Sequence, residues 1–384
     1  TDLAVTQDLA SKMAQKDPCE GNPNISVTTY TSPDGKTAKI YKNTAYDKSW
    51  FTNFLNAAVL WHCWVFVQGY VLLYIAWLIL PRWISIPFLV LYFVNMAISK
   101  APESGGRLMP LCRLDYNMQI PSGYFQMRTL VEDSVKLDGN SQYMFGLHPH
   151  GAHCLGTQAF HLAPSNPLYL LFPRVLEKTH MTCASVMFFL PWVREVLMWY
   201  GWIVVSRKNL EKHLAKGSNL GIIVGGEAES ILSENGKDKV VLEGRKGFVS
   251  LAVRYGVDLV PTYTFHLNET FTFNLNLLAA PRQWIQKNLK VCLPVLWGRW
   301  GTPVPHPAPL LVAVGAPVAV PRREQPGGEV DEAVVDRIHA QYMDALSKLF
   351  ESYKGAAGYG AERKLEVLRA PEADRVHKKT KKES

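Results

Sequence analysis

The sequence lacks several patterns that identify common kinds of site. Its six cysteines are scattered along 384 residues without a C-x-x-C pair, so neither a disulfide framework nor a zinc knuckle is readable, and a reducing compartment is favoured. No G-x-S-x-G occurs, which excludes the usual serine nucleophile elbow. Basic and aromatic residues are not interleaved and the formal net charge is only +8, so we expect no nucleic-acid partner.

Charge is also absent from one long run. Residues 57–80 contain no charged side chain, and about 20 predominantly apolar residues suffice to span a bilayer. Pro81 and Arg82 interrupt this run, and a second, shorter apolar run extends from Ile84 to Ile98. We therefore predict a membrane-embedded helical hairpin whose flanks lie on the same side of the bilayer. A pair of buried core helices is the alternative.

Beyond this region the chain alternates strand-like and helical segments. Strand-like apolar runs occupy 142–147, 201–206, 220–226, 257–265 and 310–318, and helical spacing occupies 209–217, 245–256 and 331–354. This alternation predicts an α/β sandwich with a largely parallel central sheet. The predicted regions are a loosely ordered polar extension (1–48), the membrane hairpin (49–100), the α/β domain (101–367) and a basic tail (368–384).

Three histidines follow the first of these strands in the stretch FGLHPHGAHC, residues 145–154. His148 and His150 lie two residues apart, so an extended backbone would point both to one face. With His153 the spacing is similar to a metal-ligand run, but Ala152 stands where such a run needs an aspartate. A general base among these histidines, a metal site and loop imidazoles without chemistry all stay open at this point.

A second loop, IVGGEAES at residues 223–230, places carboxylates after another predicted strand. The glycines Gly225 and Gly226 would let a carboxylate approach a neighbouring strand end closely. A carboxylate that orients a histidine also stabilises the imidazolium, as a general base requires. Glu229 is the predicted partner of the histidines, with Glu227 beside it.

Together these motifs resemble the type 2 diacylglycerol acyltransferase family, with its monoacylglycerol acyltransferase and wax synthase relatives. The resemblance spans about residues 50–367, and its motifs occur in the family's order: HPHG (148–151), LPWVREVLMWYG (190–201), VGGEAES (224–230), GRKGFVSLAVRYGVDLVPTYTF (244–265), GRWG (298–301) and YMDALSKLFESYK (342–354). The chain departs from the family's usual pattern at Glu227, where alanine is usual. It also has Phe265-His266-Leu267 where the family usually has FGE.

The resemblance implies a glycerolipid-acyltransferase-like α/β sandwich and acyl transfer from acyl-CoA to the free hydroxyl of diacylglycerol, giving triacylglycerol and CoA. His150 would be the general base and His148 a supporting residue. Related glycerolipid acyltransferases pair this base with an aspartate, which is Leu155 here, so Glu229 is the candidate replacement. A thioester is already activated, so we expect no metal and no cofactor besides the co-substrate acyl-CoA.

Substrate contacts are expected in the same loops. Backbone amides near Gly151 are candidates for stabilising the oxyanion, and the acidic loop would repel an anionic acceptor. CoA phosphates favour cations, although the available cations are equally compatible with ordinary surface charge. The predicted substrate-binding residues are Gly151, Gly225, Gly226, Glu227, Arg245, Lys246 and Arg207.

The end of the chain, Lys381-Lys-Glu-Ser384, is similar to a dilysine retrieval signal, which works on a cytosolic tail. Together with the resemblance it predicts an endoplasmic reticulum membrane protein with both termini cytosolic, and the lipid-droplet surface as a second location. The expected partners are acyl-CoA, diacylglycerol and the lipid bilayer, and a homo-oligomer stays open. The alternatives are monoacylglycerol acyltransferase or wax synthase activity, or a non-catalytic membrane lipid-binding protein.

Overall fold

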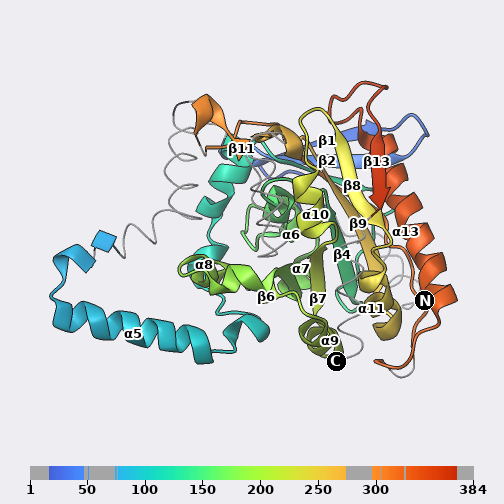
Figure 1. Ribbon diagram of the computed structural model, residues 1–384. Coiled ribbons are helices and arrows are strands. Elements are labelled where there is room, and N and C mark those ends of the chain that lie inside the picture. Colours follow the sequence, from blue (N-terminus) through green and yellow to red (C-terminus); the bar gives the residue numbers. More distant parts are fainter. Residues whose placement is uncertain are drawn as a thin grey trace, which may run out of the picture.

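The computed structural model describes residues 17–46, 51, 74–75, 77–273, 296–302, 304–323 and 326–369. Their centre is a nine-stranded sheet in the order β1-β2-β3-β12-β9-β4-β7-β5-β6 (Figure 1). Its strands are β1 (Ile25–Thr31), β2 (Thr37–Asn43), β3 (Arg128–Glu132), β4 (Tyr143–His148), β5 (Thr179–Cys183), β6 (Ile203–Val204), β7 (Asn219–Ile223), β9 (Asp258–Phe265) and β12 (Leu311–Val314). Two small ladders pair β10 (Thr272–Phe273) with β11 (Leu296–Trp297) and β8 (Asp238–Glu243) with β13 (Leu365–Arg369).

The sheet is mixed, with a parallel half. Strands β9, β4, β7, β5 and β6 run parallel to one another, so their carboxyl ends meet at one edge. β12 pairs antiparallel with β9 and parallel with β3, while β1, β2 and β3 pair antiparallel. The predicted α/β class is confirmed, and the sheet is less uniformly parallel than expected.

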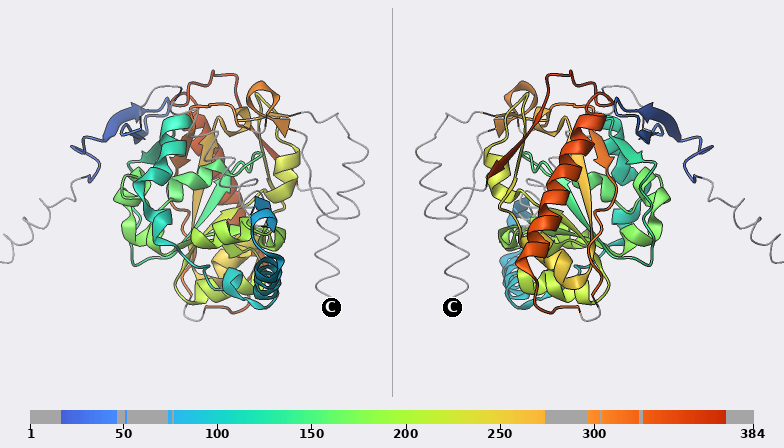
Figure 2. Two further views of the ribbon diagram at one scale, coloured as in Figure 1. Left: turned by 90° about the vertical axis from the view of Figure 1, so that its left-hand side faces the viewer. Right: turned by 90° about the vertical axis from the view of Figure 1, so that its right-hand side faces the viewer.

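Helices cover both faces of this sheet (Figures 1 and 2). One core lies under α9 (Arg207–Ala215), α11 (Gly247–Tyr255) and α13 (Glu332–Tyr353), and the other lies under α6 (Pro167–Leu171), α7 (Pro173–Glu177) and η6 (Leu155–Phe160). Along β4, Met144 faces the first core and Phe145 the second, as the two-residue period of a strand requires. The other helices are α5 (Arg82–Ile98), η2 (Ala101–Glu103), η3 (Pro110–Arg113), η4 (Asp115–Met118), η5 (Gln119–Tyr124), η7 (Ser185–Phe189), α8 (Val193–Trp199), α10 (Gly226–Ile231), η8 (Leu267–Glu269) and η9 (Arg299–Gly301).

Several predicted segments coincide with observed elements. The predicted strands at 142–147, 220–226 and 257–265 overlap β4, β7 and β9, and the predicted helix at 331–354 is α13. Gly256 ends α11 with a φ of 65°, the left-handed conformation that a C-terminal glycine provides. These positions carried strong periodicity and clear termini, which is why the sequence located them.

Residues 25–43 correct the prediction of a loosely ordered extension. They form the β1–β2 hairpin, and β2 extends the main sheet by pairing with β3. Ala38 and Ile40 on β2 are buried in one core and Tyr41 in the other. The many polar residues of this segment concealed the strand, because only one side chain in two had to be apolar.

Helix α5 projects from the domain along one side (Figure 1). Ser85 is its only buried residue, which argues against the alternative of a core helix. Within the described residues, one helical stretch, Arg82–Glu103, is long and apolar enough to cross a membrane by length and composition. Most of the predicted first hairpin segment, 57–80, lies outside the described residues, as does the tail from 370 onward.

Candidate active site

The predicted catalytic residues meet at the edge where the parallel strands end. β4 ends at His148, which a cis peptide bond joins to Pro149. β7 is followed by Gly225 and then by α10, which carries Glu229. Because β4 and β7 are neighbouring parallel strands, these two ends lie side by side.

The carboxylate of Glu229 is held by backbone amides. The residue is 1% exposed, its Oε2 accepts a hydrogen bond from the His150 N–H at 2.6 Å, and its Oε1 accepts one from the Val241 N–H of β8 at 2.9 Å. Among the described residues, no lysine or arginine pairs with it within salt-bridge distance. A Cβ at Gly225 would collide with this carboxylate, so the glycine makes room for it.

The His148 ring is buried between Glu229 and Tyr342 of α13. Its Nδ1 lies 4.0 Å from Oε1 of Glu229, which is beyond hydrogen-bond distance, and its Nε2 lies 3.1 Å from the Tyr342 hydroxyl. That hydroxyl also lies 3.3 Å from the Gly146 carbonyl oxygen. The Tyr342 hydroxyl has one proton, so two arrangements are possible. It donates to Gly146 when Nε2 of His148 carries the ring proton. It donates to Nε2 when the ring proton is on Nδ1, facing Glu229.

Tyr342 is the site residue that sequence reasoning missed. It lies 194 positions from His148 along the chain, and a Cβ at Gly146 would collide with its hydroxyl. One signal could have identified it. The helical period puts this tyrosine on the apolar face of residues 331–354, and a hydroxyl buried there needs a polar partner.

The His150 ring is oriented by the backbone of its own loop. Its Nδ1 lies 2.8 Å from the Gly151 carbonyl, and because a carbonyl only accepts, Nδ1 carries the proton of the neutral ring. Nε2 therefore keeps its lone pair. Gly151 adopts a φ of 61° and packs against Leu267, the second residue after β9. The expected contact between Glu229 and the His150 ring is replaced by one to the backbone amide of His150.

Two other groups of the histidine loop have separate environments. The His153 ring packs against Phe271 with centroids 5.2 Å apart, and burial, followed by the charge of His150, lowers the pKa of His153 to about 4. Burial, followed by the charge of Glu229, raises the pKa of the Cys154 thiol to about 12, so little nucleophilic thiolate exists at neutral pH.

No group of three or more His, Cys, Asp or Glu that could hold a metal occurs within the described residues.

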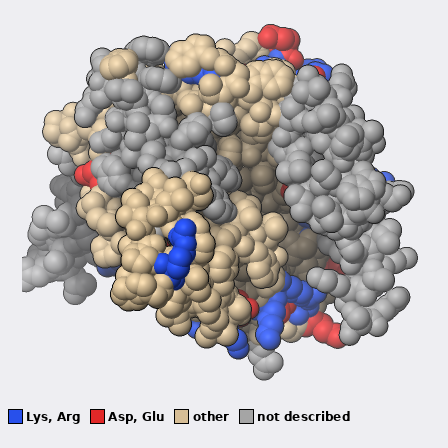
Figure 3. All heavy atoms as spheres, turned by 60° about the vertical axis from the view of Figure 1, so that its left-hand side comes forward, with Lys and Arg blue, Asp and Glu red and all other residues tan. Residues whose placement is uncertain are grey.

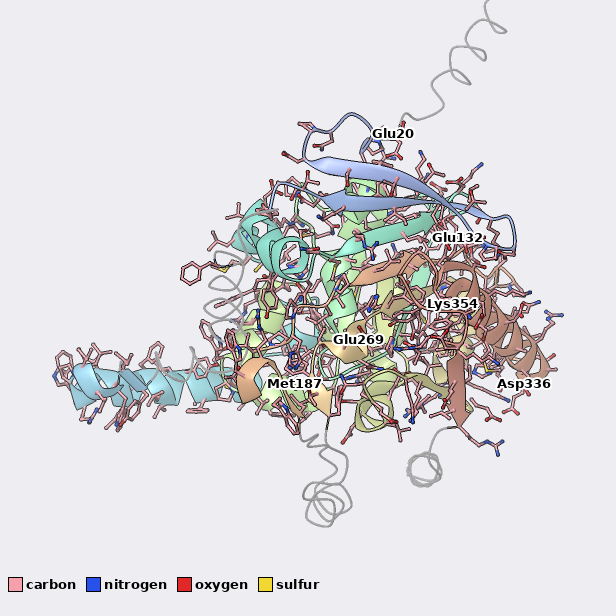
Figure 4. The ribbon with its side chains drawn as sticks, turned by 90° about the horizontal axis from the view of Figure 1, so that it is seen from above. Glu20, Glu132, Met187, Glu269, Asp336 and Lys354 are labelled. Carbon is pink, nitrogen blue, oxygen red and sulfur yellow. The ribbon has the colours of Figure 1, made fainter. Side chains whose placement is uncertain are left out.

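The predicted substrate-binding cations are spread more widely. The Arg245 guanidinium donates to the Gly225 carbonyl at 3.4 Å, which brings it to the glycine loop. Lys246 forms an ion pair with Asp336, which lies at the margin of the domain opposite α5 (Figure 4).

Arg207 pairs at 3.0 Å with Glu211 on the surface of α9. Gly226 and Glu227 begin α10, and Glu227 is exposed. Of the three predicted cations, the structure thus connects Arg245 to the site and places Lys246 and Arg207 in surface ion pairs.

Comparison with known proteins agrees with the resemblance seen in the motifs. Residues 76–368 match the family described as "Diacylglycerol acyltransferase". The chain is 33% identical over 293 residues to diacylglycerol O-acyltransferase 2 of Mus musculus, which covers 72% of this chain and 73% of that protein. It is 32% identical over 290 residues to 2-acylglycerol O-acyltransferase 3 of Homo sapiens, covering 72% and 82% respectively.

Among solved structures, the 1-acyl-sn-glycerophosphate acyltransferase PlsC of Thermotoga maritima is 15% identical, with a TM-score of 0.36 and coverage of 78% of this chain and 97% of that one. The match to the family extends over most of the chain and includes both site loops. The chain belongs to the diacylglycerol acyltransferase family and is therefore an acyltransferase of lipid metabolism.

Proposed function

We propose that the protein transfers an acyl group from acyl-CoA to the free hydroxyl of diacylglycerol, with His150 as general base. The observation that carries this proposal is the 2.8 Å contact between Nδ1 of His150 and the Gly151 carbonyl, which leaves Nε2 free to accept a proton. Membership of the family supports acyl transfer. The similarity to the mouse diacylglycerol O-acyltransferase 2 supports diacylglycerol as the acceptor.

In the proposed reaction, the acceptor hydroxyl attacks the thioester carbonyl carbon while Nε2 of His150 takes the hydroxyl proton. The negative oxygen of the tetrahedral intermediate needs hydrogen-bond donors, and the amides of Gly151 and its neighbours are candidates. Collapse breaks the carbon–sulfur bond, and the CoA thiolate takes the proton from the imidazolium. The products are an ester and CoA, so the step needs no metal and no covalent enzyme intermediate.

Glu229 and His148 would position this base rather than touch the substrate. The 2.6 Å hydrogen bond from the His150 amide to Glu229 fixes the loop that carries the proposed base. The His148 ring lies next to the carboxylate, with Nδ1 4.0 Å from Oε1, and Tyr342 contacts the opposite side of that ring. This support keeps the ring of His150 in one place during proton transfer.

The carboxylates also bear on the choice of acceptor. Glu227 is exposed on α10, in the same short helix as Glu229, so an anionic acceptor such as a glycerol phosphate would be repelled there. Diacylglycerol, monoacylglycerol and fatty alcohols are all neutral. The similarity to a 2-acylglycerol O-acyltransferase keeps monoacylglycerol as the second candidate acceptor.

A membrane location fits the same proposal, because neutral lipid acceptors reside in the bilayer. The exposed apolar helix α5 is suited to the hydrocarbon region. We place the protein at the endoplasmic reticulum membrane with both termini in the cytosol, and at the lipid-droplet surface as a second location.

The test incubates the full chain in mild detergent with labelled oleoyl-CoA and, in separate reactions, diacylglycerol, monoacylglycerol or a fatty alcohol. We expect labelled triacylglycerol, and His150→Ala should lower the rate by about 10²- to 10⁴-fold. His153→Ala, a change in the same loop, is the matched control and should keep most of the activity. Product from another acceptor alone would overturn the choice of diacylglycerol, and a fully active His150→Ala variant would overturn the base assignment.

A further inference from the structure

Three exposed apolar side chains form a ridge after β5. Phe189 is 74% exposed, Val186 48% and Leu190 37%, and we call these three residues the apolar ridge. Residues 184–192, which contain it, carry no charged side chain. Phe188 is buried and anchors the turn from beneath. Grouped, exposed apolar side chains of this size mark a contact surface, because leaving them in water is unfavourable.

The apolar ridge adjoins α5. The Trp192 amide, at the end of the same segment, donates to the Tyr92 hydroxyl of α5 at 3.1 Å. Seen from above, Met187 lies on the side of the domain along which α5 projects (Figure 4). The described residues on this face carry few charged side chains (Figure 3). The ridge and α5 therefore belong to one apolar surface.

The ridge also begins at the edge that carries the candidate active site. β5 and β4 both pair parallel with β7, so η7 starts at the edge where His148 and Glu229 lie. The last residue of β5 is Cys183, and the charge of Cys154 in the histidine loop affects the pKa of its thiol. Burial chiefly, and then the charge of Cys154, raises the pKa of the Cys183 thiol.

We propose that the apolar ridge inserts into one leaflet of a lipid bilayer beside α5 and holds the active-site edge at the membrane surface. A bilayer fits this surface because cations lie near both ends of α5 and residues 184–192 contain no charged side chain. Arg82 and Lys100 lie near the two ends of α5, where lipid phosphates would be, and no Asp or Glu occurs from residue 77 to 102. The proposal concerns membrane contact and holds for any lipid acceptor.

The contact can be mapped in the full chain without measuring activity. The protein is placed in nanodiscs of phosphatidylcholine that contain a phospholipid with a diazirine in its acyl chain, irradiated, and digested for mass spectrometry. We expect labelled residues in the ridge as well as in α5, and none on the exposed side of α13. Label in α5 with none in residues 184–192 would overturn the proposal and leave the membrane contact of α5 intact.

Two variants at one position test the cause of the labelling. Phe189→Asp should lose label from residues 184–192, because a charged side chain is costly in hydrocarbon. It should unfold at the wild-type temperature in detergent, since the side chain is 74% exposed. Phe189→Trp keeps an aromatic ring and should retain the label. Undiminished labelling of Phe189→Asp would show that the ridge lies outside the hydrocarbon and would overturn the proposal.

Discussion

Two histidine–carboxylate pairs lie at neighbouring strand ends and are built in different ways. At the end of β4, His148 and Glu229 are each 1% exposed, and the nearest ring nitrogen and carboxylate oxygen are 4.0 Å apart. At the end of β9, a 2.7 Å hydrogen bond joins His266 and Glu269, whose side chains are 12% and 34% exposed. Since β4 and β9 are adjacent parallel strands, one edge of the sheet provides both environments.

The difference shows what each carboxylate can do. Glu229 accepts hydrogen bonds from two backbone amides, and no lysine or arginine of the described residues pairs with it. Glu269 faces both His266 and the Arg363 guanidinium, 3.5 Å away. Arg363 also pairs with Asp238. The His266–Glu269 pair is thus part of an ion network, through Arg363, that joins the chain after α13 to the strands.

His266 shows how the second pair is made. It has a φ of 64°, in the left-handed region that favours glycine, and it stands where the family usually has the glycine of FGE. Its amide bonds to the Tyr359 hydroxyl, its Nδ1 to Glu269 and its Nε2 to the Ala357 carbonyl. These bonds offset the backbone strain, so the histidine ties the C-terminal segment to the end of β9.

Removal of each carboxylate should separate the two pairs most clearly. Glu229→Ala leaves two buried N–H donors without a partner, so we expect a loss of about 2–5 kcal/mol in the free energy of unfolding. Glu269→Ala breaks a partly exposed pair and should cost about 1 kcal/mol. Denaturant unfolding of the full chain in mild detergent measures both values. Equal losses in the two variants would contradict the contrast drawn between the pairs.

A tyrosine hydroxyl in each region offers the next largest effect. Tyr342→Phe removes the partner of His148, and we expect kcat to fall by up to about tenfold with KM unchanged, because a hydrogen bond of this kind contributes about 1 kcal/mol.

Tyr263→Phe is the matched control, since it removes a buried 2.8 Å hydrogen bond to Asp238 in the other network. It should lower the unfolding temperature and keep kcat. If both variants lose stability alike and both keep kcat, Tyr342 is structural and does not position the base.

The sequence was sufficient for the parts of this comparison that depend on strand order. His148, His150 and Glu229 follow strongly apolar runs, and carboxyl ends of parallel strands meet at one edge, so their proximity could be predicted. The β1–β2 hairpin could not be predicted in this way, because polar residues such as Lys39 and Lys42 hide its pattern.

The atoms that meet within the site depend on loop conformation. Glu229 accepts a hydrogen bond from the His150 amide and not from the His150 ring. This contact depends on the turn around Pro149 and Gly151, which residue spacing does not specify. Tyr342 reaches the site because α13 crosses the sheet face (Figure 2). This packing involves residues that are far from the histidine motif in the sequence. Sequence therefore predicted the members of the site more readily than their contacts.

The pH dependence of stability should give the smallest distinction between the pairs. Burial lowers the pKa of His266, but the hydrogen bonds to Glu269 and Ala357 outweigh it and raise that pKa above 6.5. The stabilisation from His266 is therefore fully present below pH 6.5 and is lost as pH rises through the raised pKa. The hydrogen bond to His266 lowers the pKa of Glu269 below 4.5, so its contribution is present above pH 4.5 and is lost as pH falls through the lowered pKa.

The pair should thus stabilise the fold most between pH 4.5 and 6.5. We expect the free energy of unfolding of wild type to exceed that of Glu269→Gln by at most about 1 kcal/mol at pH 6, and by less at pH 8. Thermal unfolding at the two pH values measures this difference. Lys348→Gln, which breaks the exposed Lys348–Asp344 pair, is the control and should show no such change, because this pair contains no histidine. A gap that widens toward pH 8 would contradict a raised pKa of His266, because a neutral imidazole has one N–H and could donate to only one of the Glu269 carboxylate and the Ala357 carbonyl.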